Sequence, residues 1–201
     1  MGISPRQFEE LKKRVSGGKR SAAPVFETQS SAPAKHEVIL GVDPSLRGTG
    51  FGIIRLARPA PQLIAQGTIQ CPPALERSRC LVKIVQELRQ AIARHQPTVC
   101  VIEALFYAQN LQTALLMGEA RGASLVAAAE AGLEIFEIAP RKVKQAIVGY
   151  GAAQKTAVAK MVQRMLRLPQ PPAPDAADAL ALALTHAHES TGFSLTPPRR
   201  I

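Results

Sequence analysis

Apolar residues recur along this chain with two different spacings, one typical of strands and one typical of helices. Short apolar runs bounded by turn-forming residues predict strands over residues 37–42, 50–57, 62–70, 98–103 and 133–138. Apolar positions at helical spacing predict helices over residues 74–94, 109–131, 140–148, 154–167 and 175–189. The first three strands follow one another directly and form an antiparallel meander, after which helices and strands alternate. The order predicts an α/β fold: a mixed sheet of three antiparallel strands followed by parallel strands, with helices on both faces.

The same pattern divides the chain into three regions. Residues 37–190 carry all of the strands and the longer helices, so they form the predicted domain. Residues 1–36 form an N-terminal extension with seven basic and three acidic residues, in which a short helix is predicted over 5–15. Residues 16–35 are rich in Ser, Gly, Ala and Pro, a composition typical of a flexible linker. Residues 191–201 are expected to be a C-terminal tail.

Composition limits the class of protein. The chain has 201 residues, 46% of them hydrophobic, and a mean hydropathy near zero, enough for one sizeable core. No run reaches the about 20 apolar residues of a membrane-spanning helix, and no signal-peptide core is present, so we expect a cytoplasmic protein. The three cysteines, Cys71, Cys80 and Cys100, have no CxxC spacing and are expected to be reduced packing residues.

Charge points to a polyanionic partner. The net charge is +10, which suits nucleic acid or an anionic membrane surface. Between Ile138 and Pro174 there are no acidic residues, but seven basic ones: Arg141, Lys142, Lys144, Lys155, Lys160, Arg164 and Arg167. A solubilising surface normally mixes both signs, so this stretch favours contacts with DNA phosphates over simple solvation.

Four acidic residues are candidates for a metal site. Asp43 and Glu103 each end a predicted strand, and Asp175 and Asp178 lie one helical turn apart at the start of the last helix. Taken alone, the last pair could simply be acids that favour a helix N-terminus. That helix is almost wholly apolar, however, so it should pack on the sheet and bring both carboxylates near the other two. Four crowded carboxylates would raise one another's pKa and titrate as a coupled set unless cations compensate.

The glycine-rich segment 41–50 allows a second interpretation. Its glycines could let the backbone approach a phosphate, as in actin-like phosphotransferases. Those folds enclose a nucleotide between two domains, whereas the 165 residues from Glu37 onward supply only one. Phe106 and Tyr107, just after Glu103, could stack on bases or fill the core. His186 and His188 on the last predicted helix are not obvious ligands.

Five sequence blocks closely resemble, in order, those of the RuvC Holliday junction resolvases. They are LGVDPSLRGTGFG, VIEALFYAQN, LLMGEARGASLVAAA, APRKVKQAIVGYGAAQK and PDAADALALALTHAH, and the resemblance covers residues 37–190. It implies a ribonuclease H-like fold, a homodimer formed through the helix around 118–129, and magnesium-dependent cutting of two strands of a four-way DNA junction. The N-terminal extension is a departure from the family pattern.

Carried over by motif, the resemblance assigns roles to individual residues. Asp43, Glu103, Asp175 and Asp178 would be the catalytic acids and would hold the metal. Lys144 and Lys155 would be basic residues of the active site, Phe106 would lie near the junction crossover, and Tyr107, Arg141 and Lys142 are further candidates for DNA contact.

The expected mechanism is hydrolysis by two Mg²⁺ ions, with Mn²⁺ as a substitute, to give 5′-phosphate products. The expected partners are four-way junction DNA, a second copy of the chain and a branch-migration motor, but no membrane. A junction-binding protein that does not cut is the alternative, and an actin-like phosphotransferase is a weaker one.

Overall fold

A mixed sheet forms the centre of the protein. The computed structural model describes residues 36–105, 110–191 and 198–201. The strands in these ranges are β1 (Val38–Asp43), β2 (Gly48–Arg55), β3 (Gln62–Gln70), β4 (Val99–Glu103), β5 (Glu134–Ile138) and β6 (Arg199–Arg200). Their order in the sheet is β3-β2-β1-β4-β5-β6. The first three are antiparallel, β4 and β5 run parallel to β1, and β6 is antiparallel to β5.

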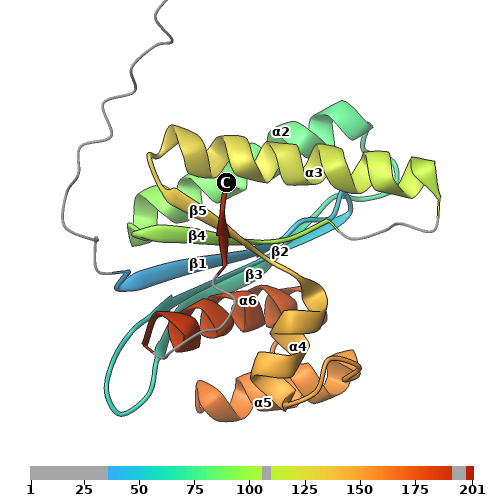
Figure 1. Cartoon of the computed structure of the whole chain (residues 1–201). Helices are drawn as coiled ribbons and strands as arrows, with labels where there is room; N and C mark the ends of the chain where they lie inside the picture. Colours follow the sequence, from blue (N-terminus) through green and yellow to red (C-terminus); the bar gives the residue numbers. More distant parts are fainter. Residues whose placement is uncertain (1–35, 106–109, 192–197) are drawn as a thin grey trace, which may run out of the picture. The chain divides into compact units, whose positions relative to one another are not determined.

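Helices cover both faces of this sheet (Figure 1). On one face lie α2 (Arg77–His95) and α3 (Leu111–Glu130). On the other lie α4 (Pro140–Val148), α5 (Lys155–Met165) and α6 (Pro174–Thr191). The predicted meander, the parallel strands after it and the two helical layers are therefore confirmed. Observed element boundaries differ from the predicted ones by only a few residues.

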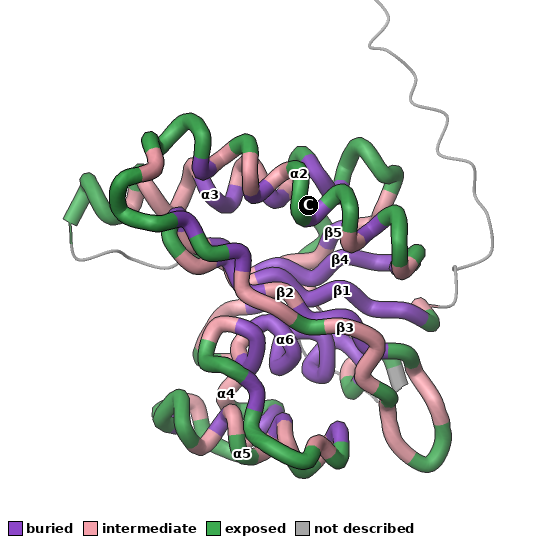
Figure 2. Tube along the Cα trace, turned by 180° about the vertical axis from the view of Figure 1, so that it is seen from behind, coloured by how far each residue is buried: buried purple, intermediate pink, exposed green. Residues whose placement is uncertain are grey.

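Alternation along the central strands creates two cores, one on each side of the sheet. In β1, Leu40 and Val42 pack with α2 and α3, whereas Ile39 packs with α4, α5 and α6. Successive side chains of a strand point to opposite faces, so a strand covered on both sides reads as one continuous apolar run. Figure 2 shows the result as an unbroken buried stretch along β1 and β4.

Helix α6 packs on the sheet at unusually close range because glycines lie beneath it. A Cβ atom added to Gly41 would lie 2.0 Å from the carbonyl oxygen of Ala179, and one added to Gly50 would lie 2.0 Å from that of Asp175. At Gly52 the same atom would meet the side chain of Leu180 at 2.6 Å. These glycines therefore let the α6 backbone lie directly on β1 and β2. This role differs from the close approach to a phosphate that the sequence also allowed.

Two short signals set the ends of the neighbouring helices. Asn110 caps α3, since its side-chain oxygen accepts a hydrogen bond of 2.7 Å from the backbone N–H of Thr113. Pro140 occupies the first turn of α4, and Gly149 ends that helix with a φ of +98°. These positions match the predicted start and end of α4.

The C-terminal end of the chain joins the sheet edge, although the sequence predicted only a tail there. Arg199 and Arg200 pair with Glu137 and Phe136 of β5. A two-residue strand of arginines has no apolar pattern that could reveal it. Ion pairs hold it in place: Arg200 contacts Glu134 at 2.7 Å, and Arg199 contacts Glu137 at 3.5 Å.

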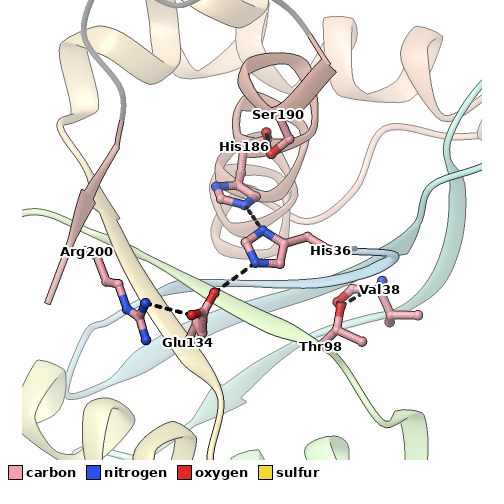
Figure 3. A network of polar contacts seen from close by, with 7 residues as sticks. All are labelled: His36, Val38, Thr98, Glu134, His186, Ser190 and Arg200. Carbon is pink, nitrogen blue, oxygen red and sulfur yellow. Dashed lines mark hydrogen bonds and ion pairs between the residues drawn. The ribbon is translucent and has the colours of Figure 1, made fainter. Parts of the chain in front are cut away.

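A polar network at the same edge links β5 to α6 (Figure 3). His36 bridges Glu134 and His186, with N···O and N···N distances of 3.1 and 2.9 Å. Phe136 packs against both imidazole rings, at centroid distances of 5.6 and 5.0 Å. His186 is buried and contacts His36 and Phe136, so it acts here as a core residue.

Several predictions fall outside the described residues. These are the helix over 5–15, the linker over 16–35, and the positions of Phe106 and Tyr107. In the described part of the chain, no helix has both the length and the apolar character needed to cross a membrane. All three cysteines are free and buried, as the sequence predicted for packing residues.

Candidate active site

Asp43 and Glu103 end two neighbouring parallel strands on the same face of the sheet. In the register between β1 and β4, Val42 lies opposite Ile102, which places the two acids side by side one position later. The preceding residues Val42 and Ile102 point into the core under α2 and α3. Because side chains alternate, the two carboxylates point to the opposite face, where α6 lies. The predicted convergence of the two strand ends is thus present.

The start of α6 adds the other two acids from above this strand edge. Asp178 raises the pKa of both Asp43 and Glu103, so its charge lies close to each of them. Asp175 lies over the beginning of β2, where a Cβ atom on Gly48 would be 3.0 Å from its Oδ2 atom. It raises the pKa of Asp43 as well, although less than Asp178 does. All four predicted acids therefore gather at one site, with Asp175 on the β2 side.

Burial and mutual repulsion perturb the two strand-end acids. The pKa of Glu103 is raised to about 8, mainly by burial and then by the charges of Asp43 and Asp178. Burial, followed by the charge of Asp178, raises the pKa of Asp43 to about 6. Protonated Glu103 donates a hydrogen bond to Asp43, so the two groups share one proton near neutral pH. Such a pair is characteristic of functional sites.

Lys155 is the basic residue that meets this cluster. It begins α5, and its Nζ atom donates a hydrogen bond of 2.8 Å to Oδ2 of Asp178. That hydrogen bond is the main cause of the raised pKa of Lys155, whose ammonium in turn lowers the pKa of Asp43 and Glu103. Most of the Lys155 side chain is exposed, so the charge stands at the open rim of the site.

The donor chemistry of the cluster fits a hard divalent cation. Carboxylate oxygens are the ligands that Mg²⁺ prefers. Burial and the repulsion between the acids raise the pKa values of Asp43 and Glu103, and a bound cation would offset both effects. Across the described ranges, no three acidic, histidine or cysteine side chains are arranged to coordinate one ion as they stand. The proton on Glu103 and the ammonium of Lys155 provide the compensating charge in this arrangement.

The other predicted contact residues occupy α4, close to the same face. Lys144 is half-buried and Arg141 is exposed, with the Arg141 side chain packed against Gly151. Lys142 forms an ion pair with Glu189 of α6. The stretch between Ile138 and Pro174 has no acidic residue of its own, but α6 supplies a counter-charge for two of its basic residues, Lys142 and Lys155. The acids that pair with them are distant in sequence.

One pair of buried charged residues beside the site was not predicted. Arg121 of α3 contacts Glu137 of β5 at 2.7 Å and donates a hydrogen bond of 3.3 Å to the backbone carbonyl of Glu103. The available signal was an arginine on the same helical face as Ser124 and Ala128, in a stretch rich in small residues. A charged residue on a buried face needs a partner, and that partner is on another element.

Comparison with known proteins agrees with this geometry. The family model for the crossover junction endodeoxyribonuclease RuvC matches residues 39–186. The chain is 43% identical over 162 residues to RuvC of Chromohalobacter salexigens, covering 81% of this chain and 87% of that protein. It is 47% identical over 150 residues to RuvC of Halorhodospira halophila, covering 75% and 89%.

Solved structures of Holliday junction resolvases are also similar to this chain. The structure of T. thermophilus RuvC in complex with Holliday junction substrate superposes with a TM-score of 0.75 and 32% identity, covering 83% of this chain and all of the other. The yeast mitochondrial Holliday junction resolvase Ydc2, at 10% identity and a TM-score of 0.51, shares the fold. The fold is therefore the ribonuclease H-like one that the resemblance implied. On its sequence and its structure alike, the chain belongs to the RuvC family of crossover junction endodeoxyribonucleases.

Proposed function

We propose that this protein is a Holliday junction resolvase, which cuts two opposing strands of a four-way DNA junction and leaves 5′-phosphate ends. One observation carries the proposal: Asp43 and Glu103 converge at the ends of adjacent parallel strands, under Asp178 and beside the ammonium of Lys155. Membership of a family of crossover junction endodeoxyribonucleases supports it.

The four acids are the proposed ligands of two Mg²⁺ ions, for which Mn²⁺ could substitute. Bound there, the metal would activate a water molecule and stabilise the leaving 3′ oxygen. Asp43, Glu103 and Asp178 contribute carboxylates that lie close to one another, and Asp175 contributes from the β2 side. On loading, Glu103 would lose its proton to become a ligand, and the bound cations would neutralise the negative charge of the cluster.

The two lysines have a separate proposed role at the scissile phosphate. Lys155 lies at the rim of the acid cluster and presents an ammonium whose raised pKa keeps it charged. Lys144 lies on the neighbouring helix α4, where it is half-buried. Positive charge held near the phosphate would stabilise the negative charge that develops during hydrolysis.

The surrounding surface would bind the junction backbone. Arg141 and Lys142 of α4 are proposed phosphate contacts, although Lys142 would have to share its charge with Glu189. Phe106 and Tyr107 follow Glu103 in the sequence and are proposed to stack on bases near the crossover. Selectivity for a junction over a plain duplex would come from branched shape and deformability.

A homodimer is the proposed assembly. Exposed apolar side chains lie along α2 and α3, namely Val82, Leu111, Leu115 and Val126. A second copy packed on this face would cover them, and the two-fold symmetry of the pair would match that of an open junction, so that two active sites face two strands. A branch-migration motor as a further partner, and a cytoplasmic location, are proposed from the family resemblance.

The function is tested by incubating the protein with a synthetic four-way junction and with a matched linear duplex, each in Mg²⁺ and in chelator. We expect paired cuts in opposing strands of the junction and none in the duplex, in Mg²⁺ and not in chelator, with 5′-phosphate ends. Tight junction binding without cuts under any condition would favour the non-cutting alternative. Equal cutting of junction and duplex would contradict junction selectivity.

A further inference from the structure

Arg121 connects three elements from a buried position. It lies in the middle of α3 and is 9% exposed. Its Nη2 atom contacts Oε2 of Glu137 on β5 at 2.7 Å, and its Nη1 atom donates to the carbonyl oxygen of Glu103 on β4 at 3.3 Å. A guanidinium has several donors in a fixed planar geometry, so one side chain can hold a carboxylate and a carbonyl in defined relative positions.

The carbonyl that Arg121 holds belongs to the last residue of β4. Strand β1, which runs beside it, ends at Asp43 and is followed by Pro44, which has no backbone N–H to continue the ladder on that side. On the other side, the N–H of Ala104 donates to Ile138. The peptide after Glu103 is therefore fixed between β5 and the buried guanidinium, at the point where the chain leaves the sheet.

The Arg121–Glu137 pair is itself supported from the sheet edge. Glu137 also contacts Arg199 of β6 through its other carboxylate oxygen, at 3.5 Å. Both side chains of the Arg121–Glu137 pair are largely buried, with 11% and 19% exposure. A desolvated charge pair of this kind is costly to break, because removal of one partner leaves the other uncompensated. Its position is thus much better defined than that of an exposed ion pair.

We propose that Arg121 is a positioning residue for Glu103. By holding the Glu103 carbonyl, the guanidinium fixes the backbone from which that carboxylate projects toward Asp43 and Asp178, and it links this backbone to α3. The inference rests on the proposed function, in which the Glu103 carboxylate holds metal. It adds that Arg121 of α3, on the opposite face of the sheet, holds the backbone of the acid cluster in place. The exposed side of α3 is part of the proposed dimer surface.

The test uses the full-length protein and the substitution Arg121→Lys, which keeps the positive charge but cannot reproduce the two-armed contact. Arg89→Lys is the matched control, because Arg89 makes a bidentate contact with Glu130 that joins α2 to α3 away from the acids. Arg121→Met is a second, harsher variant. If it does not fold, Arg121→Lys decides the outcome alone.

Three quantities are measured for each variant. They are the single-turnover rate of junction cleavage, junction affinity in chelator, and the Mg²⁺ concentration at the midpoint of the metal-induced rise in melting temperature. For Arg121→Lys we expect a rate loss of about 10- to 100-fold, since small misplacement of a catalytic group has effects of this size. The Mg²⁺ midpoint should rise several-fold, junction affinity should stay within about twofold, and Arg89→Lys should match the wild type on all three.

Several results would overturn the proposal. One is a rate and a Mg²⁺ midpoint for Arg121→Lys that both equal those of the wild type. Another is a rate loss fully explained by weaker junction binding or by a smaller folded fraction, which would indicate only a structural role. If the wild type itself does not cut junctions, the proposed function fails, and the Mg²⁺ midpoint still decides whether Arg121 supports the acid cluster.

Discussion

Lys155 donates a hydrogen bond of 2.8 Å to Asp178, so the first residue of α5 is tied to the N-terminal part of α6 at the rim of the acid cluster. The same ammonium lowers the pKa of Asp43 and Glu103, which lie on the sheet below. A side chain in this place can act on the acids and on a bound phosphate alike.

Substitution of Lys155 should therefore affect turnover more than binding. We expect Lys155→Met to reduce the single-turnover rate about 100-fold, with a loss of junction affinity below about threefold, because one phosphate contact among many contributes little to binding. Lys160→Met, on the same helix, is the control for loss of one positive charge. The measurement is cleavage rate and affinity across a salt series. An affinity loss large enough to explain the rate loss would mean that Lys155 only attracts DNA.

The raised pKa values predict that the acids destabilise the metal-free protein as pH rises. Asp43 and Glu103 have pKa values of about 6 and about 8 in the folded state, above those of ordinary carboxyls. The folded state thus holds protons that the unfolded state releases, and stability falls between about pH 4 and pH 8. Glu103→Gln should raise the free energy of unfolding at pH 8 by about 1–3 kcal/mol in chelator and by little at pH 4.

Mg²⁺ should make the wild type more stable than Glu103→Gln at pH 8. It should raise the melting temperature of the wild type at pH 8 and have much less effect on Glu103→Gln, because the variant lacks one ligand. Glu87→Gln, an exposed position on α2, is the control in both conditions. Denaturant unfolding with and without Mg²⁺ measures both effects. A Glu103→Gln variant that is less stable than the wild type in chelator at pH 8 would refute the account of a strained acid cluster.

The glycines beneath α6 should be ranked by the atom that an added methyl group would meet. Gly50→Ala would bring Cβ to 2.0 Å from a backbone oxygen, whereas Gly48→Ala would bring it to 3.0 Å from a carboxylate oxygen that can move. We expect Gly50→Ala to destabilise the protein by about 3 kcal/mol or more and Gly48→Ala by less than half of that. Urea unfolding measures the difference. Equal stability of the two variants would show that α6 does not need to pack so closely.

His186 should make the protein less stable in mild acid. Burial, and secondly the neighbouring His36, lower its pKa to about 4. The unfolded state therefore binds a proton that the folded state does not. The contribution of His186 to the free energy of unfolding falls as pH decreases from about 6.5 to 4 and is constant above pH 7. The effect is at most about 3 kcal/mol.

His186→Gln removes this titration. The stability difference between variant and wild type should change with pH only in that window. Urea unfolding at closely spaced pH values from 4 to 8 provides the measurement. A difference that does not vary with pH would mean that His186 is not held neutral by its surroundings.

Much of the fold and the acid cluster could be predicted because it depends on local patterns. The continuous apolar runs before Asp43 and Glu103 identify central parallel strands, and the ends of such strands meet at one edge. The apolar helix after Asp178 had to pack on the sheet, which brought its first turn to that edge. These relationships need only the periodicity and the order of the elements.

The remaining features depend on contacts between residues far apart in sequence. The ion pairs of Lys142 with Glu189 and of Arg121 with Glu137 produce no local sequence pattern. In the sequence, each of these residues looks like an ordinary charged residue. The glycines of β1 and β2 gave a misleading signal, since close approach by a helix and close approach by a phosphate require the same absence of a side chain. Strand β6 has no hydrophobic pattern, as it is held by ion pairs.

The most direct test of the central claim separates catalysis from binding at Asp43. Cleavage of a four-way junction in Mg²⁺, and binding of the same junction in chelator, are measured for the wild type, Asp43→Asn and Glu87→Gln. We expect Asp43→Asn to lose at least about 1,000-fold in cleavage rate and to bind the junction as tightly as the wild type or more tightly, since a negative charge has been removed. Glu87→Gln should resemble the wild type in both. Near-normal cleavage by Asp43→Asn would contradict the assignment of the acid cluster as the active site.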